Sequence, residues 1–414
     1  MPDVPVRGLV FDPFDPRWVT DPFPLYAELR EGAPVHRNHL GFWVLSRHAD
    51  CLALLRDRRA SADSTRIDPS RLAFELRRDP ATAGEVDVAM VEARPFLFRD
   101  PPDHTRLRGL VSKAFTPRVV ESLRPRTQQI VDELLDAALE VGEVDLLEAF
   151  AYPLPVRVIC ELLGVPPDDQ DRFGEWSAAL ARGLDPEFLL AADVIEAREA
   201  AVVQFAQYFF ELLAERRASP RDDLLSALAV AEDGGETLSE AELLSTCILL
   251  LVAGHETTVN LISGGTHALA RHPDEWRRLC EDPGVVRNGV EELLRYVSPV
   301  QFTVRAITED VELAGVLMEA GDFVMALLGS GNHDPEAFPD AEDLDLGRAN
   351  VNHLGFGFGI HHCLGAPLAR METQVALTSL ARRAPGLVLT TDTVTYRPTV
   401  ALRGLAALPV SLRS

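Results

Sequence analysis

The chain has 414 residues, of which 47% are hydrophobic and 25% charged, a composition typical of globular proteins and not of disordered or fibrous ones. Its formal net charge of -24 disfavours nucleic acid and anionic membranes as partners, because the long-range field repels both. The 5 cysteines are odd in number and widely spread, unlike a disulfide framework, so most are expected to be small buried residues.

The N-terminal stretch MPDVPVRGLVFDPFDPRW is broken by prolines and aspartates. It has neither the apolar region of a signal peptide nor the length of a membrane anchor. We therefore expect a cytoplasmic protein that binds no membrane.

Strand-like runs, β-branched or alternating, lie near both ends of the chain, at residues 34–38, 41–46, 300–313, 322–330 and 407–412. Between Pro117 and Tyr296 the apolar residues recur at three- and four-residue spacing, as in amphipathic helices. The pattern predicts a mainly α protein with a smaller β region, an α+β fold. We expect one domain over 1–414, with a helix-rich body at about 100–296 and 364–384 and β-rich parts near both termini and about 300–330.

Two polar stretches broken by prolines, residues 61–87 and 166–188, are predicted as loops or lids. Loops of this length in a compact domain are more often functional than not.

The longest helical pattern covers residues 239–272, with Ser239 as the N-cap and Glu242 three residues on, as in a capping box. Its uncharged part is too short to span a bilayer, so a buried central helix is predicted. The sequence AGHETT in its middle, residues 253–258, places glycine, a carboxylate and β-branched hydroxyl residues where a stable helix favours Ala or Leu. Such local conflicts are typical of functional or strained sites.

The segment FGFGIHHCLG, residues 356–365, combines alternating glycines with Cys363 directly before a predicted helix. Glycines allow several backbone N–H groups to converge on an anion, and the helix N-terminus favours a thiolate over a thiol. The residues leave four uses open. Zinc would draw on His353, His361, His362 and Cys363, although consecutive residues do not readily face one tetrahedral metal. A dinucleotide loop lacks its third glycine in either register, a nucleophile lacks a local base, and an axial ligand to haem iron is the fourth use.

The pattern F-G-x-G-x-H-x-C-x-G resembles the haem-thiolate signature of the cytochrome P-450 superfamily. The matching residues are Phe356, Gly357, Gly359, His361, Cys363 and Gly365. The resemblance implies haem b with the Cys363 thiolate as axial ligand, and a cytochrome P-450 fold that holds the haem between the central helix and the helix after the cysteine loop. It also implies that Phe356, His361 and Gly365 contact the cofactor.

AGHETT is similar to the oxygen-binding motif of this family, with Glu256 and Thr257 as its acid-alcohol pair. Cleavage of dioxygen needs protons delivered in a site that otherwise excludes water, which gives both residues catalytic roles. Ala253 and Gly254 lack bulk and are expected to leave room for dioxygen and substrate above the porphyrin.

Residues 100–117 resemble the helix that bacterial members place beside the haem, where His104 and Arg108 share one face at i,i+4. Together with Arg305 and His361 they are the expected partners of the haem propionates. Glu292 and Arg295 match the structural E-x-x-R pair of the family. Asp343 and Leu344 stand where its next arginine is expected, so Arg348 is a candidate substitute.

The resemblance covers nearly the whole chain and implies a soluble monooxygenase that inserts one atom of O2 into an apolar molecule by hydroxylation or epoxidation, in secondary metabolism or xenobiotic oxidation. Electrons are expected from a separate ferredoxin and ferredoxin reductase, because no such segment is appended. The electrons would enter near a basic patch formed by Arg106, Lys113, Arg118 and Arg370. The protein is expected to be a monomer. A peroxide-driven fatty-acid peroxygenase or decarboxylase and a noncatalytic haem sensor or carrier are the rival functions.

The resemblance places the substrate walls in residues 59–98, 176–190, 300–303 and 399–402. The pocket residues it suggests are Val300, Phe302, Thr303, Val400 and Leu402. Their apolar character favours a lipophilic ligand such as a terpenoid, steroid or polyketide.

Overall fold

A computed structural model describes residues 10–72, 94–170, 172–185, 189–233 and 235–413. Residues 1–9, with the start of the N-terminal stretch, lie outside the described residues, as do 73–93 and 186–188 of the two predicted loops and substrate walls.

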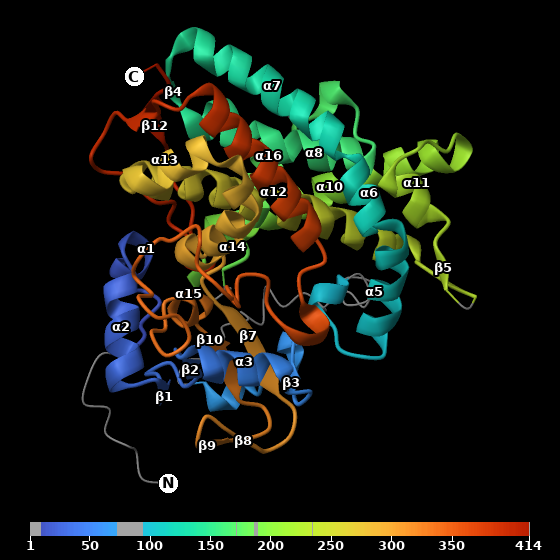
Figure 1. Cartoon of the computed structure of the whole chain (residues 1–414). Coiled ribbons are helices and arrows are strands. Elements are labelled where there is room, and N and C mark those ends of the chain that lie inside the picture. The colour runs from blue at the N-terminus through green and yellow to red at the C-terminus, as the bar shows by residue number, and fades with distance from the viewer. Residues whose placement is uncertain (1–9, 73–93, 171, 186–188, 234, 414) are drawn as a thin grey trace.

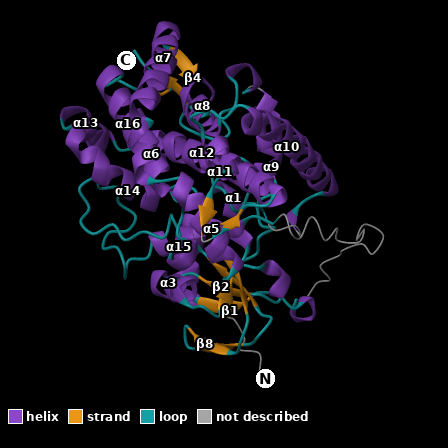
Figure 2. Cartoon of the chain, turned by 90° about the vertical axis from the view of Figure 1, so that its right-hand side faces the viewer, coloured by secondary structure: helices purple, strands orange, loops and turns teal. Residues whose placement is uncertain are grey.

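Helices make up most of the described chain, and most of them form the upper part of the molecule in Figure 1, whereas the main sheet lies below them with α2 (Phe23–Gly32) and α3 (His48–Arg56) beside it. Figure 2 shows the same division from the side. The helices are α1 (Arg17–Thr20), α2 (Phe23–Gly32), α3 (His48–Arg56), α5 (Asp103–Ala114), α6 (Pro117–Ser122), α7 (Arg124–Val141), α8 (Pro153–Leu163), α9 (Arg172–Arg182), α10 (Ala192–Ala218), α11 (Leu224–Ala229), α12 (Glu240–Arg271), α13 (Pro273–Glu281), α14 (Val286–Val297), α15 (Leu328–Asn332) and α16 (Ala366–Arg383).

The strands are short and come from distant parts of the chain. They are β1 (Val35–Arg37), β2 (Trp43–Leu45), β3 (Ala60–Ser61), β4 (Glu143–Asp145), β5 (Glu232–Asp233), β6 (Glu236–Thr237), β7 (Thr303–Ile307), β8 (Val311–Leu313), β9 (Val316–Met318), β10 (Phe323–Ala326), β11 (Val388–Leu389) and β12 (Pro409–Ser411). The main sheet has the order β1-β2-β10-β7-β3, in which β2 and β10 are parallel and the other pairs antiparallel. N-terminal strands are thus joined to strands from beyond residue 300, as the predicted α+β pattern requires.

Helix α12 crosses the middle of the helical layer and packs against α8, α10, α14 and α16. Its N-terminus has the predicted capping box, in which the Ser239 side chain accepts from the Glu242 N–H and the Glu242 carboxylate accepts from the Ser239 N–H. Among the described helices α12 alone has the length and hydropathy of a membrane span, but 67% of its most apolar window is buried inside the protein. The central-helix prediction is therefore confirmed, and this burial is that of a core helix.

The predicted strand over residues 322–330 is wrong in its second half. Strand β10 ends at Ala326, and the short helix α15 begins at Leu328. All residues from Phe323 to Asn332 are buried, so this segment has no alternation of polar and apolar residues by which a strand could be distinguished from a helix. The helical prediction for residues 117–296 also missed β4, whose residues pair with β12 from the C-terminus.

Glu372 is a buried acid in the middle of α16. Its side chain is 0% exposed, and neither carboxylate oxygen has a hydrogen-bond partner among the described residues. Burial raises the pKa of Glu372 well above its ordinary value, because nothing nearby stabilises the charged form.

We therefore predict that stability falls with rising pH because of this residue. Above the pKa of the unfolded chain, near 4.3, the folded state keeps a proton that the unfolded state releases, so the free energy of unfolding falls by about 1.4 kcal/mol per pH unit until the folded pKa is reached. Glu372→Gln should remove this slope in denaturant titrations from pH 5 to 8. Glu281→Gln, at an exposed position, should retain it, and equal slopes in both variants would contradict the prediction.

Candidate active site

The cysteine loop precedes α16 and is held by backbone hydrogen bonds. The Cys363 N–H donates to the Phe356 carbonyl at 2.8 Å, and the Gly357 N–H donates to the Leu354 carbonyl at 2.8 Å. Gly359 has a φ of +70°, and a Cβ there would lie 2.7 Å from the Leu55 carbonyl oxygen. Glycine is therefore required at 359, where the loop passes the backbone at the end of α3.

The Cys363 sulfur accepts hydrogen bonds from the backbone N–H groups of Gly365 and Ala366 at the start of α16. Desolvation by the surrounding protein nevertheless raises the pKa of Cys363 above its ordinary value, because it outweighs those N–H groups and the charges of Arg108 and Arg370, although the residue itself is exposed. The N–H groups at the start of the helix thus favour the thiolate as expected, but desolvation has the larger effect. A coordinating metal ion deprotonates such a thiol outright, so these surroundings fit a metal ligand better than a free nucleophile.

Four nitrogen-bearing side chains from three segments meet beside this loop. The rings of His104 on α5 and His361 in the loop have centroids 4.3 Å apart. The pKa of His361 is lowered to about 3, first by burial and then by Arg305 on β7, His104 and Arg108. The predicted donor set is therefore brought together, and Figure 1 shows α5 beside the loop that leads into α16.

No carboxylate among the described residues forms an ion pair with these donors, and Asp100 acts on Arg305 and His104 only through its more distant charge. Within the part of the chain that the structure describes, neither ring nitrogen of His361 nor Nε2 of His104 has a hydrogen-bond partner. Arg108 donates to the His362 carbonyl at 2.5 Å, and Arg305 donates to the Val304 carbonyl at 2.7 Å, but neither forms an ion pair. Burial also lowers the pKa of Arg305 to about 10. Buried donors without partners are costly, so this site fits a ligand that carries carboxylates.

Helix α12 presents the AGHETT residues to different surroundings. Ala253 is exposed, although its neighbours Val252 and His255 are buried, and the Thr257 hydroxyl donates to the Ala253 carbonyl at 3.0 Å. A Cβ on Gly254 would lie 3.1 Å from the Ile159 side chain on α8. The expectation that Gly254 opens space above a porphyrin is corrected, because this glycine allows α8 and α12 to pack closely.

Glu256 is 2% exposed and forms an ion pair with Arg397, whose Nη1 lies 2.9 Å from Oε2. Burial raises the pKa of Glu256, but the hydrogen bond from His255 and the charge of Arg397 outweigh burial and hold it below its ordinary value. The Nδ1 of His255 lies 2.7 Å from the Leu251 carbonyl oxygen, and its Nε2 lies 2.7 Å from the Ser177 hydroxyl and 3.5 Å from Oε1 of Glu256. Arg397 and Ser177 were missed in the sequence, because neither stands in a motif.

Comparison with known proteins identifies this arrangement. A sequence profile described as Cytochrome P450 matches residues 188–383. The polyketide biosynthesis cytochrome P450 PksS of Bacillus subtilis (strain 168) is 39% identical over 98% of this chain and 100% of its own length. Its solved structure superposes with a TM-score of 0.87. The chain belongs to the cytochrome P450 family.

Two further relatives are cytochromes P450 with named activities. The 6-deoxyerythronolide B hydroxylase of Saccharopolyspora erythraea is 42% identical over 98% of this chain and 99% of its own length. The mycinamicin IV hydroxylase/epoxidase of Micromonospora griseorubida is 44% identical over 93% of this chain and 94% of its own length. This cytochrome P450 is accordingly a monooxygenase, and its cofactor is haem with a cysteine thiolate as axial ligand. The two propionates of haem are the carboxylates that the four donors fit.

The structural pair of this cytochrome P450 is a buried triad. Glu292 and Arg295 are both 0% exposed and bond twice at 2.8 Å. The Arg348 Nε lies 3.0 Å from Oε1 of Glu292, which identifies Arg348 as the third member. Arg295 also donates to the carbonyls of Asn332 and Ala341. The pair ties α14 to the long loop before the cysteine.

The five predicted substrate-pocket residues lie in two adjoining segments. Val300 and Leu402 form an isolated antiparallel bridge, and Thr303 begins β7. Phe302 is buried in a cluster with Phe42 and Phe323, and Val400 packs against the same cluster. The N–H groups of Val400 and Ala401 donate to the carboxylate of Asp185, which follows α9 and was not predicted.

Nothing in the described part of the chain gathers three His, Cys, Asp or Glu side chains in a way that could hold a metal ion. His353, a ligand in the zinc alternative, lies 3.1 Å from Glu291 instead.

Proposed function

We propose that this chain is a haem-thiolate monooxygenase that inserts one oxygen atom of O2 into an apolar small molecule, with Cys363 as the axial ligand. The observation that carries the proposal is the convergence of His104, Arg108, Arg305 and His361 beside the cysteine loop. The Phe356 carbonyl accepts from the Cys363 N–H, and a Cβ on Gly365 would lie 3.9 Å from the Cys363 sulfur. Phe356, Gly365 and, from α12, Ala253 are therefore proposed to contact the haem. When bound, the haem supplies the iron that activates O2.

In this proposal the chain itself orients the cofactor and manages protons. The four donors hold the propionates by charge-assisted hydrogen bonds, and the N–H groups of Gly365 and Ala366 reduce the negative charge on sulfur. Glu256 holds or releases a proton, and Arg397, whose side chain is 29% exposed, links it to the surface. The Thr257 hydroxyl, which donates to the Ala253 carbonyl, would supply a proton donor on the α12 side of the haem.

The substrate is proposed to be a lipophilic product of secondary metabolism, hydroxylated or epoxidised by the enzyme. A polyketide and a steroid-like molecule are the two proposed classes, because one relative is named for polyketide biosynthesis and another is a vitamin D(3) 25-hydroxylase. Val300, Thr303, Val400 and Leu402 are proposed wall residues. An optical screen for compounds that perturb the haem spectrum would identify the ligand.

Electrons are proposed to come from a ferredoxin and its reductase. Of the predicted basic patch, Arg106 is paired with Glu242 and Arg370 with Glu291, so their charges are largely balanced. Lys113 is exposed but donates to the Glu232 carbonyl at 3.0 Å, and Arg118 is exposed, which makes Arg118 the stronger candidate for contact with an acidic ferredoxin. We also propose a cytoplasmic monomer folded as one domain, since the main sheet joins strands from both ends of the chain.

The substitution Thr257→Ala tests the monooxygenase assignment. We expect NAD(P)H consumption with a surrogate ferredoxin and reductase to continue, while product per NAD(P)H falls by about 10²-fold, because proton delivery is impaired. Thr258→Ala is the matched control: its hydroxyl donates to the Gly254 carbonyl, and its side chain is buried in the helix packing. A carrier yields no product in any variant, and a peroxygenase driven by hydrogen peroxide is unaffected by Thr257→Ala; either result would contradict the proposal.

A further inference from the structure

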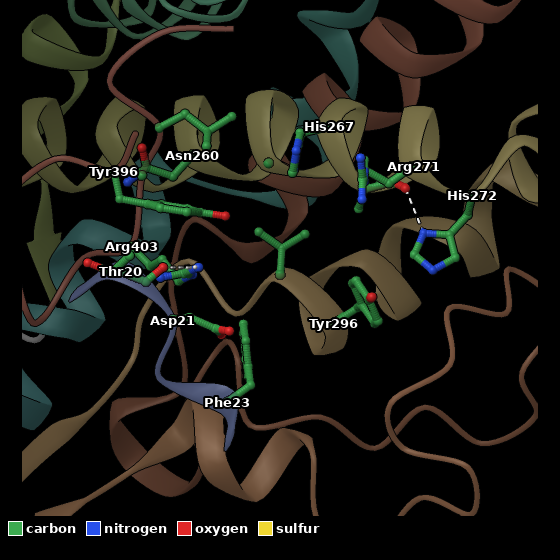
Figure 3. Close-up of a pocket in the computed structure, with 15 residues that line it drawn as sticks. Thr20, Asp21, Phe23, Asn260, His267, Arg271, His272, Tyr296, Tyr396 and Arg403 are labelled. Atoms are coloured by element: carbon green, nitrogen blue, oxygen red, sulfur yellow. Dashed lines mark hydrogen bonds between the residues drawn. The ribbon is translucent and has the colours of Figure 1, made fainter. Parts of the chain in front are cut away.

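A second pocket lies on the C-terminal half of α12, apart from the cysteine loop. It has a volume of about 540 Å³ and is lined by four segments: the junction of α1 and α2, α12, the end of α14, and residues 396–405. Figure 3 shows the labelled side chains around this space, with His267 and Arg271 extending from α12 and Tyr396, Asp21 and Tyr296 facing them. A volume of this size is within the range of small-molecule sites.

The α12 wall is one continuous stripe. Asn260, Gly264, His267 and Arg271 recur at three- and four-residue spacing and therefore lie on one helix face. A Cβ on Gly264 would lie 2.6 Å from Val297, so the glycine lets α14 approach and close that side of the pocket. Asn260 is 2% exposed, and its Oδ1 has no hydrogen-bond partner among the described residues.

The pocket is positively charged, although the chain carries a formal net charge of -24. Arg271 and Arg403 line it, and Asp21 is its one acidic residue among the described lining residues. Within the part of the chain that the structure describes, neither arginine forms an ion pair with a carboxylate. Arg403, which is 9% exposed, donates to the carbonyls of Val19 and Thr20. These carbonyls satisfy its hydrogen-bond donors but do not cancel its positive charge.

The positive charge of the pocket affects the pKa of His267. Its pKa is lowered below the ordinary value first by burial and then by Arg271, Arg403 and His272. An anion bound among these groups would act in the opposite direction and raise the pKa of His267. Binding near neutral pH should therefore take up protons.

Aromatic rings form the rest of the wall. The Arg403 guanidinium lies over the ring of Tyr396 at 3.6 Å from its centroid and over Phe23 at 5.3 Å. Tyr296 lines the opposite side, edge-on to His272. Aromatic walls of this kind can pack against a flat aromatic ring of a ligand. A guanidinium group held over an aromatic ring can bind a carboxylate through two parallel hydrogen bonds.

We propose that this pocket binds a small aromatic carboxylate, with its carboxylate on Arg271 and Arg403 and its ring between Tyr396 and Tyr296. The site has a physical connection to the catalytic helix. Residues 396–405 also carry Arg397, whose N–H donates to the Gly404 carbonyl at 2.9 Å and whose side chain pairs with Glu256. The binding proposal is nevertheless independent of the catalytic role of Glu256.

Calorimetric titration of the haem-loaded protein with benzoate tests the proposal. A haem-coordinating azole is added first, so that the haem pocket is blocked. We expect benzoate to bind, benzamide to bind at least about tenfold more weakly, and Arg271→Gln to weaken benzoate about tenfold through loss of a charge-assisted hydrogen bond. Arg271 is exposed, so this variant should fold. Titrations in two buffers of different ionisation enthalpy should show proton uptake at pH 7.

Arg277→Gln is the matched control, because Arg277 is an exposed arginine on α13 outside the pocket. It should leave benzoate binding unchanged. The proposal is overturned if benzoate and benzamide bind equally, if Arg271→Gln has no effect, or if the azole abolishes binding. Inorganic phosphate that binds as tightly as benzoate would overturn the aromatic carboxylate in favour of a general anion site.

Discussion

Replacement of Glu292 by Gln is expected to lower the free energy of unfolding by about 3–5 kcal/mol, because it leaves two arginines without their counter-charge in the interior. Arg295 is 0% exposed and the Arg348 side chain 11% exposed, so water cannot replace the lost carboxylate at Arg295. Against a typical domain stability of about 5–15 kcal/mol, this loss is large enough to reduce the yield of folded protein severely. Equilibrium denaturation, or soluble yield where folding fails, measures the effect.

Asp274→Asn provides the matched control. Asp274 and Arg277 form an i,i+3 pair of the same chemistry, with the Asp274 side chain 89% exposed. Exposed pairs contribute at most about 1 kcal/mol, so this variant should unfold close to the wild type. Equal stability losses in Glu292→Gln and Asp274→Asn would show that burial does not give the triad its importance.

Replacement of Glu256 by Gln is expected to reduce the rate of product formation by about 10²-fold, because the amide cannot exchange a proton. Folding should be affected less, since Arg397, its ion-pair partner, is 29% exposed and can be hydrated. Product analysis alongside thermal unfolding separates the two effects. A rate within a few-fold of wild type would remove Glu256 from the proton pathway.

Arg397→Gln distinguishes positioning from catalysis. Arg397 helps to hold the pKa of Glu256 below its ordinary value against burial, so its removal should raise that pKa. In a plot of the rate of product formation against pH, the part that depends on the ionisation of Glu256 should then move to higher pH. The Arg397→Gln variant keeps the Glu256 carboxylate, so this shift measures only the effect of the lost positive charge. An unchanged profile would mean that the ion pair has only a structural role.

Sequence patterns correctly predicted the features that depend on residues close together in the chain. The capping box of α12, the helix after Cys363 and the helix face shared by His104 and Arg108 depend on residues close in sequence, and the structure has all three. The resemblance of motifs to one family supplied what spacing alone left open, namely the choice of haem among four uses of Cys363. It also indicated Arg348 as the partner of Glu292.

Contacts between distant segments were not predictable in the same way. Arg397 lies 141 positions from Glu256, and Asp185 lies 215 positions from Val400, with no repeat or motif to connect either pair. The role of Gly254 depends on Ile159 of another helix, so its sequence context suggested open space where the fold has close packing. Charge pairing likewise changed the basic patch, because Arg106 and Arg370 have acidic partners from elsewhere in the chain.

The absorption spectrum of the reduced protein with carbon monoxide tests the central claim most directly. With Cys363 as the axial ligand, purified protein supplemented with hemin should give the red-shifted Soret band of a thiolate-ligated haem. Cys363→Ser should lose this band, and Cys280→Ser, which changes a partly buried cysteine on α13, should keep it. A colourless protein after supplementation, or a carbonyl adduct with imidazole-like absorption, would contradict the account.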